Sequence, residues 1–249
     1  MMLLIDSGNS RVKWAFVKGN NWLKSGMLPT SEYLHLSERI TSSCEELGKD
    51  INDVDQIWVS NVAGEQVADH VRTIGTGCQE KPRFIVARDQ QCGVRNSYEM
   101  SETLGVDRWA GLIGAWSMLN AECLVVNCGT ATTIDALSGQ GEFLGGLIVP
   151  GIKLMQTGLY GATAGLTPIK GEFESFPKST PNAIFSGAIQ ATCGAIQRQH
   201  GLLKTNHAKV VLSGGAADDL SSHVNLTIVR VEHLVLQGLQ VIAQHESTA

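Results

Sequence analysis

A short polar turn near the start of the chain has the composition of a phosphate-binding loop. Asp6-Ser7-Gly8-Asn9-Ser10 follows the apolar run Met2–Ile5 and precedes a segment in which Val12, Trp14 and Phe16 alternate with other residues. This pattern predicts a strand, a tight turn and a second strand. Backbone N–H groups in such a turn bind phosphate, and the acid at the strand end can hold Mg²⁺ directly or through water. Taken alone, the segment fits an ordinary polar hairpin turn at least as well.

A second turn of the same kind lies about half a chain further on. Asn127-Cys128-Gly129-Thr130-Ala131-Thr132-Thr133 follows the buried run Leu124–Val126 and leads into a predicted strand at 131–137. Small hydroxylated residues after a buried strand are costly unless something polar is bound there. The repeated order of strand, Asp or Asn, glycine and strand predicts two similar domains. We place them at 1–115 and 116–249.

A third segment has the features of an adenosine site. The predicted strand Lys209–Ser213 ends in Gly214-Gly215-Ala216-Ala217, and such small residues let a flat ring lie against the backbone. Taken alone, two glycines after a strand indicate only an ordinary turn. The chain contains neither a Walker A loop nor a G-x-G-x-x-G that opens a helix, so P-loop and nicotinamide-binding readings have little support.

A helix with charged residues in its first turn supplies candidates for acid–base chemistry. Apolar residues recur at three- and four-residue steps between Gly105 and Asn120, which predicts an amphipathic helix. Asp107 heads this helix, where the helix dipole favours a carboxylate. The neighbouring Arg108 can pair with a carboxylate of a substrate. The ordinary alternative is helix N-terminal charge beside a surface arginine.

The remaining apolar patterns outline an alternation of strands and helices. Thr180-Pro181 fits the start of a helix, with the threonine as N-cap and the proline in the first turn. The other predicted strands are Ile57–Val62, Arg83–Val86 and Leu144–Ile148, and the other predicted helices are Gly64–Thr73, a segment from Gly151, Thr180 to about Gln199, and Glu232–His245.

The bulk composition is that of a globular protein. Of 249 residues, 43% are apolar and 17% are charged. The net charge of −5 disfavours nucleic acid or an anionic membrane as a partner. No apolar run approaches the roughly 18 residues of a membrane span, and Met1–Ile5 is too short for a secretory signal. The cysteines form no C-x-x-C pair, which suggests a reducing cytoplasm; they are Cys44, Cys78, Cys92, Cys123, Cys128 and Cys193.

Taken in order, the three turns resemble the phosphate-1, phosphate-2 and adenosine motifs of the actin-like ATPase superfamily. Within it, the chain resembles the type III pantothenate kinase family along its whole length. The matching segments are Asp6–Lys13, Tyr98 with Gly105-Val106-Asp107-Arg108-Trp109, Cys128–Asp135, Gly145–Gly151 and Ser213-Gly214-Gly215. The G-x-D-R-W element is the most specific, because the wider superfamily does not share it. The implied fold is α/β, with two ribonuclease H-like domains and a nucleotide cleft between them.

The resemblance also implies a reaction and a set of site residues. A family member transfers the γ-phosphoryl group of Mg²⁺-bound ATP to pantothenate, giving 4'-phosphopantothenate in the first step of coenzyme A synthesis. Asp107 is the expected general base, and a homodimer is implied because the acceptor site lies at the dimer interface. The residues expected to bind ATP are Asp6, Ser7, Gly8, Asn9, Ser10, Arg11, Val12, Lys13 and Thr130, and those expected to bind pantothenate are Tyr98, Gly105, Val106, Asp107, Arg108 and Thr180.

The sequence departs from the family pattern at two positions. Ser10 stands where threonine is usual, and Asn127 stands where the family has an aspartate expected to bind an activating K⁺ or NH₄⁺ ion. Tyr98 also fits a core aromatic residue, and Thr180 also fits a simple helix cap.

One competing interpretation is another kinase or phosphatase of the superfamily, which has no use for the G-x-D-R-W helix. The other is a non-catalytic accessory factor, which should have lost the base or the phosphate turn; Asp107 and Asp6 are both present.

Overall fold

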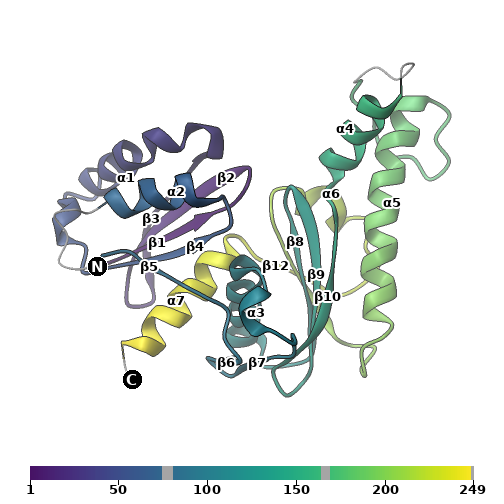
Figure 1. Cartoon of the computed structure of the whole chain (residues 1–249). Helices are drawn as coiled ribbons and strands as arrows, with labels where there is room; N and C mark the ends of the chain where they lie inside the picture. Colours follow the sequence, from purple (N-terminus) through teal and green to yellow (C-terminus); the bar gives the residue numbers. More distant parts are fainter. Residues whose placement is uncertain (75–80, 164–168, 248–249) are drawn as a thin grey trace. The chain divides into compact units, whose positions relative to one another are not determined.

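The computed structural model describes residues 1–74, 81–163 and 169–247 (Figure 1). The chain folds into two compact units, the first made of Met1–Met118 and Leu234–Ala249, and the second of Leu119–His233. This division differs from the expected one into 1–115 and 116–249, because the C-terminal helix joins the first unit. Cys78 lies outside the described residues, and the other five cysteines are free thiols. No helix of the described ranges has the length and apolar character needed to cross a bilayer.

The first unit is built on a five-stranded sheet with the order β3-β2-β1-β4-β5. Strand β1 pairs antiparallel with β2 and parallel with β4. The strands of the sheet are β1 (Met2–Ser7), β2 (Arg11–Lys18), β3 (Asn21–Pro29), β4 (Gln56–Asn61) and β5 (Arg83–Phe84). The segment after β5 forms an antiparallel hairpin of β6 (Gln90–Gln91) and β7 (Val94–Asn96). The helices are α1 (Leu36–Glu45), α2 (Glu65–Thr73), α3 (Val106–Leu119) and α7 (Leu234–Glu246), with 3-10 turns η1 (Thr30–His35), η2 (Ile51–Asp53) and η3 (Ser101–Thr103).

The central strands of this sheet, β1 and β4, are buried on both faces. Leu3 and Ile5 of β1 belong to a core shared with Ile40 of α1 and Val71 of α2. Helix α7 packs against β1, β2 and β4. Because successive side chains of a strand alternate between faces, Leu4, which lies between Leu3 and Ile5, faces away from the α1–α2 core. The near-continuous apolar run of β1 is what a strand covered on both sides requires.

Two glycines let helices α3 and α7 approach each other closely. A Cβ atom on Gly238 would lie 1.8 Å from the carbonyl oxygen of Ala110, and one on Gly114 would lie 2.9 Å from that of Leu234. Glycine usually weakens a helix, but here it allows direct contact between the two backbones. This contact fixes α7 to α3 within the first unit, although more than a hundred residues separate them in the sequence.

The second unit repeats the topology of the first. Its strands lie in the order β10-β9-β8-β11-β12, with β8/β9 and β9/β10 antiparallel and β8/β11 and β11/β12 parallel. They are β8 (Cys123–Cys128), β9 (Ala131–Leu137), β10 (Glu142–Pro150), β11 (Lys209–Ser213) and β12 (Ile228–Arg230), and the helices are α4 (Ile152–Ala162), α5 (Thr180–His200) and α6 (Ala217–Ser221). Ile189 of α5 and Leu220 of α6 are buried with β8 residues such as Val126 in one core.

The two units therefore share one arrangement of strands, and the predicted α/β fold with two ribonuclease H-like units is confirmed. In each, a central strand runs antiparallel to the next strand in the chain and parallel to a later one. The turn after the central strand, at β1–β2 or β8–β9, occupies the same place in both units. The repeat predicted from the two polar turns is thus a repeat of whole sheets.

Candidate active site

The first polar turn is held at its base and exposed at its tip. The amide of Gly8 donates to the carbonyl of Arg11 at 3.1 Å. Thr30 anchors the turn from the side, because its hydroxyl donates to the carbonyl of Gly8 at 2.6 Å and its amide donates to that of Ser10 at 3.0 Å. Asn9 and Ser10 are exposed. The sequence had not indicated Thr30, whose position after Pro29 at the end of a strand carries no distinctive signal.

Asp6 is a buried carboxyl group in an unusual electrostatic environment. Only 8% of the residue is exposed, and Lys13 is its partner across the β1–β2 pair. Burial raises the pKa of Asp6 from 3.8 to about 7; Lys13 opposes this rise, and the negative charge of Asp107 adds to it. A carboxylate in this position is stabilised when a further cation binds near it. Asp6 and Asp107, which are far apart in sequence, therefore interact within the first unit.

The head of helix α3 presents the Asp107 carboxylate in a fixed orientation. Its Oδ1 accepts the amide of Arg108 at 2.9 Å, while the Gly105 carbonyl accepts the first helical bond from Trp109 at 2.9 Å. A Cβ atom on Gly105 would lie 2.8 Å from Asp107 Oδ1. Glycine at 105 therefore leaves room for this carboxylate. Val106 is the first residue of the helix.

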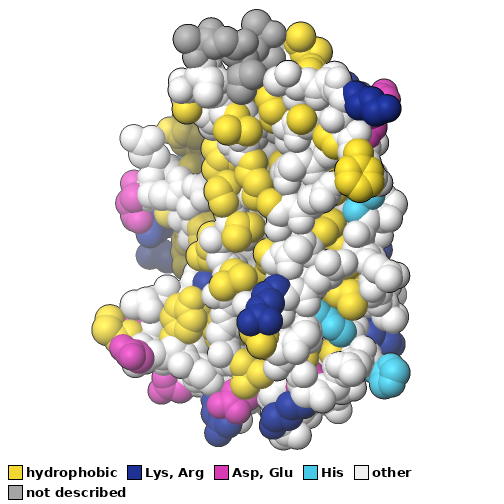
Figure 2. Space-filling model, turned by 90° about the vertical axis from the view of Figure 1, so that its right-hand side faces the viewer, with side chains coloured by type: hydrophobic (Ala, Val, Ile, Leu, Met, Phe, Trp, Pro, Cys, Tyr) yellow, Lys and Arg dark blue, Asp and Glu magenta, His cyan; other side chains and the backbone are white. Residues whose placement is uncertain are grey.

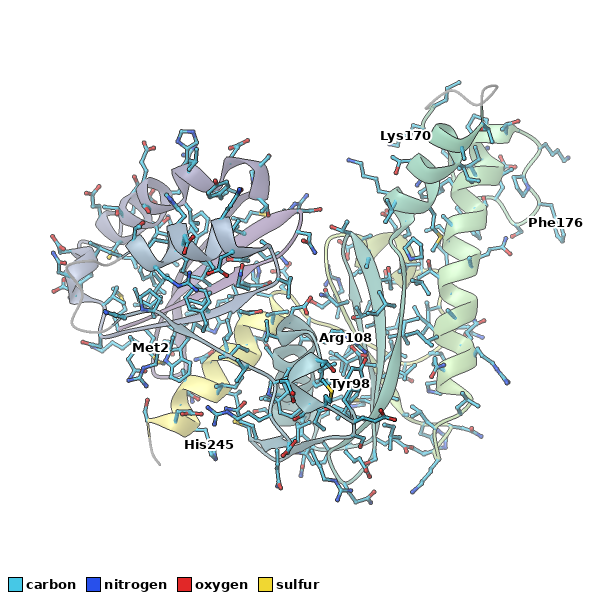
Figure 3. All side chains as sticks on the ribbon, viewed as in Figure 1. Met2, Tyr98, Arg108, Lys170, Phe176 and His245 are labelled. Carbon is cyan, nitrogen blue, oxygen red and sulfur yellow. The ribbon has the colours of Figure 1, made fainter. Side chains whose placement is uncertain are left out.

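Arg108 and Tyr98, both predicted to hold the acceptor, lie together (Figure 3). The guanidinium of Arg108 donates to the Tyr98 hydroxyl at 2.9 Å and lies 5.7 Å from the centre of its ring. Arg108 is mostly buried, at 8% exposure. Asn96 orders the loop that carries Tyr98, since its side chain accepts the Tyr98 amide at 3.1 Å and donates to the carbonyl of Ser101 at 3.1 Å. Tyr98 is half-buried, so it is not a core aromatic.

The second polar turn is built in the same manner as the first. The amide of Gly129 donates to the carbonyl of Ala131 at 3.0 Å, and Gly151 donates to the carbonyl of Thr130 at 2.9 Å. A Cβ atom on Gly151 would lie 2.3 Å from the carbonyl oxygen of Gly129, so a larger residue would displace the turn. Thr130 is exposed at the tip.

The predicted adenosine segment lies directly against the end of β8. Gly214 has φ +98°, and a Cβ atom there would lie 2.4 Å from the Cys128 carbonyl oxygen, which accepts the amide of Ala216 at 3.1 Å. Asn127, one residue earlier, is half-buried between Ser213 on β11 and Thr133 on β9, its partners in register. The segments predicted to hold ATP phosphate, cation and adenosine thus converge at one edge of this sheet.

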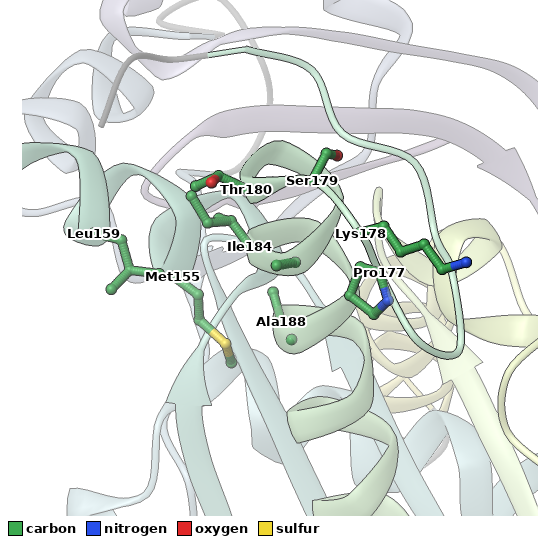
Figure 4. A pocket seen from close by; sticks show the side chains of 10 residues that line it. Met155, Leu159, Pro177, Lys178, Ser179, Thr180, Ile184 and Ala188 are labelled. Carbon is green, nitrogen blue, oxygen red and sulfur yellow. The ribbon is translucent and has the colours of Figure 1, made fainter. Parts of the chain in front are cut away.

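Thr180 lies apart from these loops, on a groove between α4 and α5 (Figure 4). The groove has a volume of about 660 Å³. Thr180 is exposed and is the first residue of α5, and the N-cap is Ser179, whose hydroxyl accepts the amide of Asn182 at 3.4 Å. The prediction that Thr180 caps the helix was therefore wrong by one residue, and its side chain is free of that structural role. The residues lining the groove include Met155, Leu159, Ile184 and Ala188.

Two other residues of the predicted ATP loop have different surroundings. Val12 is fully buried in the core of the first unit, so only its backbone can face a ligand. Arg11 is exposed, and its guanidinium lies 3.7 Å from the sulfur of Met27.

A divalent ion fits the first unit through Asp6. Among residues 1–74, 81–163 and 169–247, no three or more His, Cys, Asp or Glu side chains form a ligand group for a metal. Asp6 offers Mg²⁺ a carboxyl group with a raised pKa, which a bound cation would lower. Mg²⁺ retains several waters and is commonly bound by one or two carboxylates together with substrate phosphates.

Comparison with known proteins gives a consistent family. The family model described as type III pantothenate kinase matches residues 2–201. A type III pantothenate kinase of Nitrosospira multiformis is 40% identical over 250 residues, covering 99% of this chain and 92% of the relative. That of Aromatoleum aromaticum is 39% identical and covers the whole of both chains.

Solved structures with low sequence identity share the fold. Component A of (R)-2-hydroxyglutaryl-CoA dehydratase from Acidaminococcus fermentans is similar with a TM-score of 0.59 at 11% identity, covering 99% of this chain and 98% of the other. The activator of 2-hydroxyisocaproyl-CoA dehydratase from Clostridium difficile, with bound ADPNP, has a TM-score of 0.56 at 10% identity, covering 99% and 94%. At these identities the likeness concerns the fold.

The burial of Asp6 predicts a specific dependence of stability on pH. Between pH 4 and 7 the folded protein keeps a proton on Asp6 that the unfolded chain has lost, so this group lowers the free energy of unfolding as the pH rises. Asp6→Asn removes the effect. In Mg²⁺-free buffer, the variant should gain on the order of 1–3 kcal/mol over the wild type between pH 5 and pH 8. Urea unfolding measures this gain, with the exposed Glu45→Gln as control. A stability difference that stays constant from pH 5 to pH 8 would contradict the prediction.

Proposed function

The chain belongs to the type III pantothenate kinase family, and we propose that it transfers the γ-phosphoryl group of ATP to the primary hydroxyl of pantothenate. The product is 4'-phosphopantothenate, and the reaction is the first step of coenzyme A synthesis. The observation that supports the assignment best is the head of α3, where Asp107 lies beside the Arg108–Tyr98 pair and interacts electrostatically with Asp6. This arrangement combines an acceptor-side base with a phosphate-side carboxylate in one unit.

In this proposal Asp107 is the general base. Phosphoryl transfer requires mainly positioning and charge neutralisation, together with one group that accepts the hydroxyl proton. Asp107 is half-buried at the start of a helix, and one of its oxygens is already occupied by the Arg108 amide. The second oxygen remains to accept the proton of the substrate hydroxyl.

The acceptor is held by charge and by shape. Arg108 is a mostly buried cation whose guanidinium donates to the Tyr98 hydroxyl. It pairs with the carboxylate of pantothenate, with Tyr98 closing the other side. Gly105 and Val106 contribute backbone close to the reacting hydroxyl. Thr180 is the remaining acceptor residue, supplied by a second copy of the chain.

ATP is held by the two polar turns. The exposed backbone of the first turn and the side chain of Lys13 bind phosphate oxygens, and Thr130 does so from the second turn. Asp6 would hold Mg²⁺ through water, and the ion would supply positive charge to the phosphates during the transfer. The proposed ATP ligands of the first turn are Asp6, Ser7, Gly8, Asn9, Ser10, Arg11, Val12 and Lys13.

The second unit has a surface suited to a second copy of the chain. Hydrophobic side chains gather on the face shown in Figure 2. On α4, Leu154 and Leu159 are 47% and 46% exposed, and on β10, Ile148 is 63% exposed. Neighbouring exposed apolar side chains are a common feature of protein–protein interfaces. We propose a homodimer through α4 and the groove lined by Thr180, so that each acceptor site is completed by its partner.

A non-catalytic accessory role is less well supported. A non-catalytic protein would not require Asp6, Lys13 and Asp107 to lie near one another in the first unit. We place the proposed enzyme in the cytoplasm, where its substrates are present and its cysteines would stay reduced.

The proposed function predicts that ADP is released when ATP, Mg²⁺ and pantothenate are all present. Asp107→Asn should lower turnover on the order of 10²–10⁴-fold, because a general base is removed. Glu102→Gln, an exposed carboxylate just before the same helix, is the control. A coupled ADP assay measures both. Equal ADP release with glucose or without acceptor would refute the substrate, and near-full turnover of Asp107→Asn would refute the base.

The dimer proposal predicts a mass twice the 26.7 kDa of the chain. Leu159→Asp places a charge in the apolar groove and should yield monomers that have lost pantothenate-dependent activity. Leu34→Asp, at an exposed leucine of the first unit, should stay dimeric and active. Light scattering gives the masses. A wild-type enzyme that is active as a monomer would contradict the proposal.

The change at position 127 predicts a weak response to monovalent cations. An amide retains one oxygen ligand but lacks the full charge of an aspartate, which is worth a few kcal/mol of attraction at an effective dielectric near 20. We propose that this enzyme needs more K⁺ or NH₄⁺ than its Asn127→Asp variant, or is indifferent to it. Initial rates are measured against K⁺ in a buffer free of both ions. Identical K⁺ saturation and activation of the two proteins would show that position 127 is structural.

A further inference from the structure

Buried polar atoms without partners cluster around Asp6. In the part of the chain that the structure describes, three buried side-chain atoms lack a hydrogen-bond partner: Ser7 Oγ, Trp14 Nε1 and Ser60 Oγ. Two of the three belong to neighbours of Asp6, since Ser7 follows it in the chain and Ser60 lies opposite it on β4. Buried polar groups are normally hydrogen-bonded, so each exception requires an explanation.

Ser60 is placed to act on Asp6 itself. The parallel pairing of β1 with β4 sets Ser60 beside Asp6, and the antiparallel pairing with β2 sets Lys13 on its other side. Residues paired in register present their side chains on the same face of a sheet. Lys13, Asp6 and Ser60 thus form a row across three adjacent strands. Ser7 pairs with Asn61 and faces the opposite side.

The unpaired hydroxyl of Ser60 destabilises the free protein. It is fully buried, and a buried donor without a partner destabilises the fold. A serine hydroxyl can change partner by rotation about χ1. A charged carboxylate is the acceptor that such a donor prefers, because hydrogen bonds to ionised groups are stronger than neutral ones.

We propose that Ser60 is a positioning residue for the phosphate site. When a Mg²⁺–nucleotide complex binds, the Ser60 hydroxyl donates to one oxygen of the ionised Asp6 carboxylate. Lys13 neutralises the same group from the other side, and the second carboxylate oxygen is turned toward the hydrated metal ion. This inference rests on the proposed role of Asp6 in holding Mg²⁺–ATP, but not on the identity of the phosphoryl acceptor.

Nucleotide binding without the acceptor tests the proposal directly. Affinities for a non-hydrolysable ATP analogue are measured by calorimetry in Mg²⁺ and in EDTA, for the full chain and its variants. Ser60→Ala should lower the affinity in Mg²⁺ about tenfold, the effect of one hydrogen bond to a charged group, and leave the affinity in EDTA unchanged. Ser60→Thr, which keeps the hydroxyl, should restore most of the loss. Ser43→Ala is the control, because it removes a buried hydroxyl of α1 that donates to the Arg39 carbonyl at 2.8 Å.

A merely structural role for Ser60 would give a different result. It would lower the melting temperature of Ser60→Ala and reduce both affinities equally, and that outcome overturns the proposal. The proposal is also overturned if the ratio of the affinity in Mg²⁺ to the affinity in EDTA is the same in Ser60→Ala as in the wild type. The same holds if nucleotide binding by the wild type does not depend on Mg²⁺. If Ser60→Ala does not fold, Ser60→Cys, which has a similar volume and a weak donor, replaces it. A wild type that binds the analogue with Mg²⁺ but does not phosphorylate pantothenate would refute the proposed function and leave the role of Ser60 standing.

Discussion

The burial of the Asp6 carboxyl group at the end of β1 is the constraint around which the first unit is organised. A buried carboxylate is stable only with opposite charge or hydrogen-bond donors nearby. The β1–β2 register supplies Lys13, but Asp107 lies close enough to raise the pKa further. Lys13 thus offsets only part of the effect of burial and of Asp107 on Asp6, and a cation bound nearby would stabilise the ionised carboxylate further. The free protein is thereby prepared for a metal–nucleotide complex.

The repeated topology explains why each unit has a polar turn directly after its central strand. In each unit the central strand pairs antiparallel with its successor, so the chain must turn sharply at the end of that strand. The amides of Gly8 and Gly129 donate hydrogen bonds that close these turns. The residues directly after each glycine are exposed at the tip of the turn. The second unit has no buried carboxylate at the place of Asp6; it has Asn127 between two hydroxylated residues. The same architecture therefore presents one turn with a carboxyl group, in the first unit, and one neutral turn, in the second.

The sequence predicted those elements whose pattern is strong and local. The bounds of β9 and β11 agree with the predicted strands, and the apolar stripe of α3 located that helix within one residue at either end. Strand β3 and helix α1 were not predicted, because β3 is half-exposed along its length and has lysine and glycine in the middle. The place of α7 in the first unit depends on Gly114 and Gly238, whose contact no local pattern reveals. Thr30 and Ser60 escaped notice for the same reason, because each acts on residues that are distant from it in the sequence.

The titration of Asp6 is the most direct test of this account. Carbon-13 NMR of protein labelled at the aspartate carboxyl groups, with Asp6→Asn to assign the signal, gives the pKa in the free protein and in the complex with Mg²⁺ and a non-hydrolysable ATP analogue. The account predicts a pKa of about 7 in the free protein and a clear fall on formation of the complex. An ordinary carboxyl pKa in the free protein that does not change when the complex forms would contradict it.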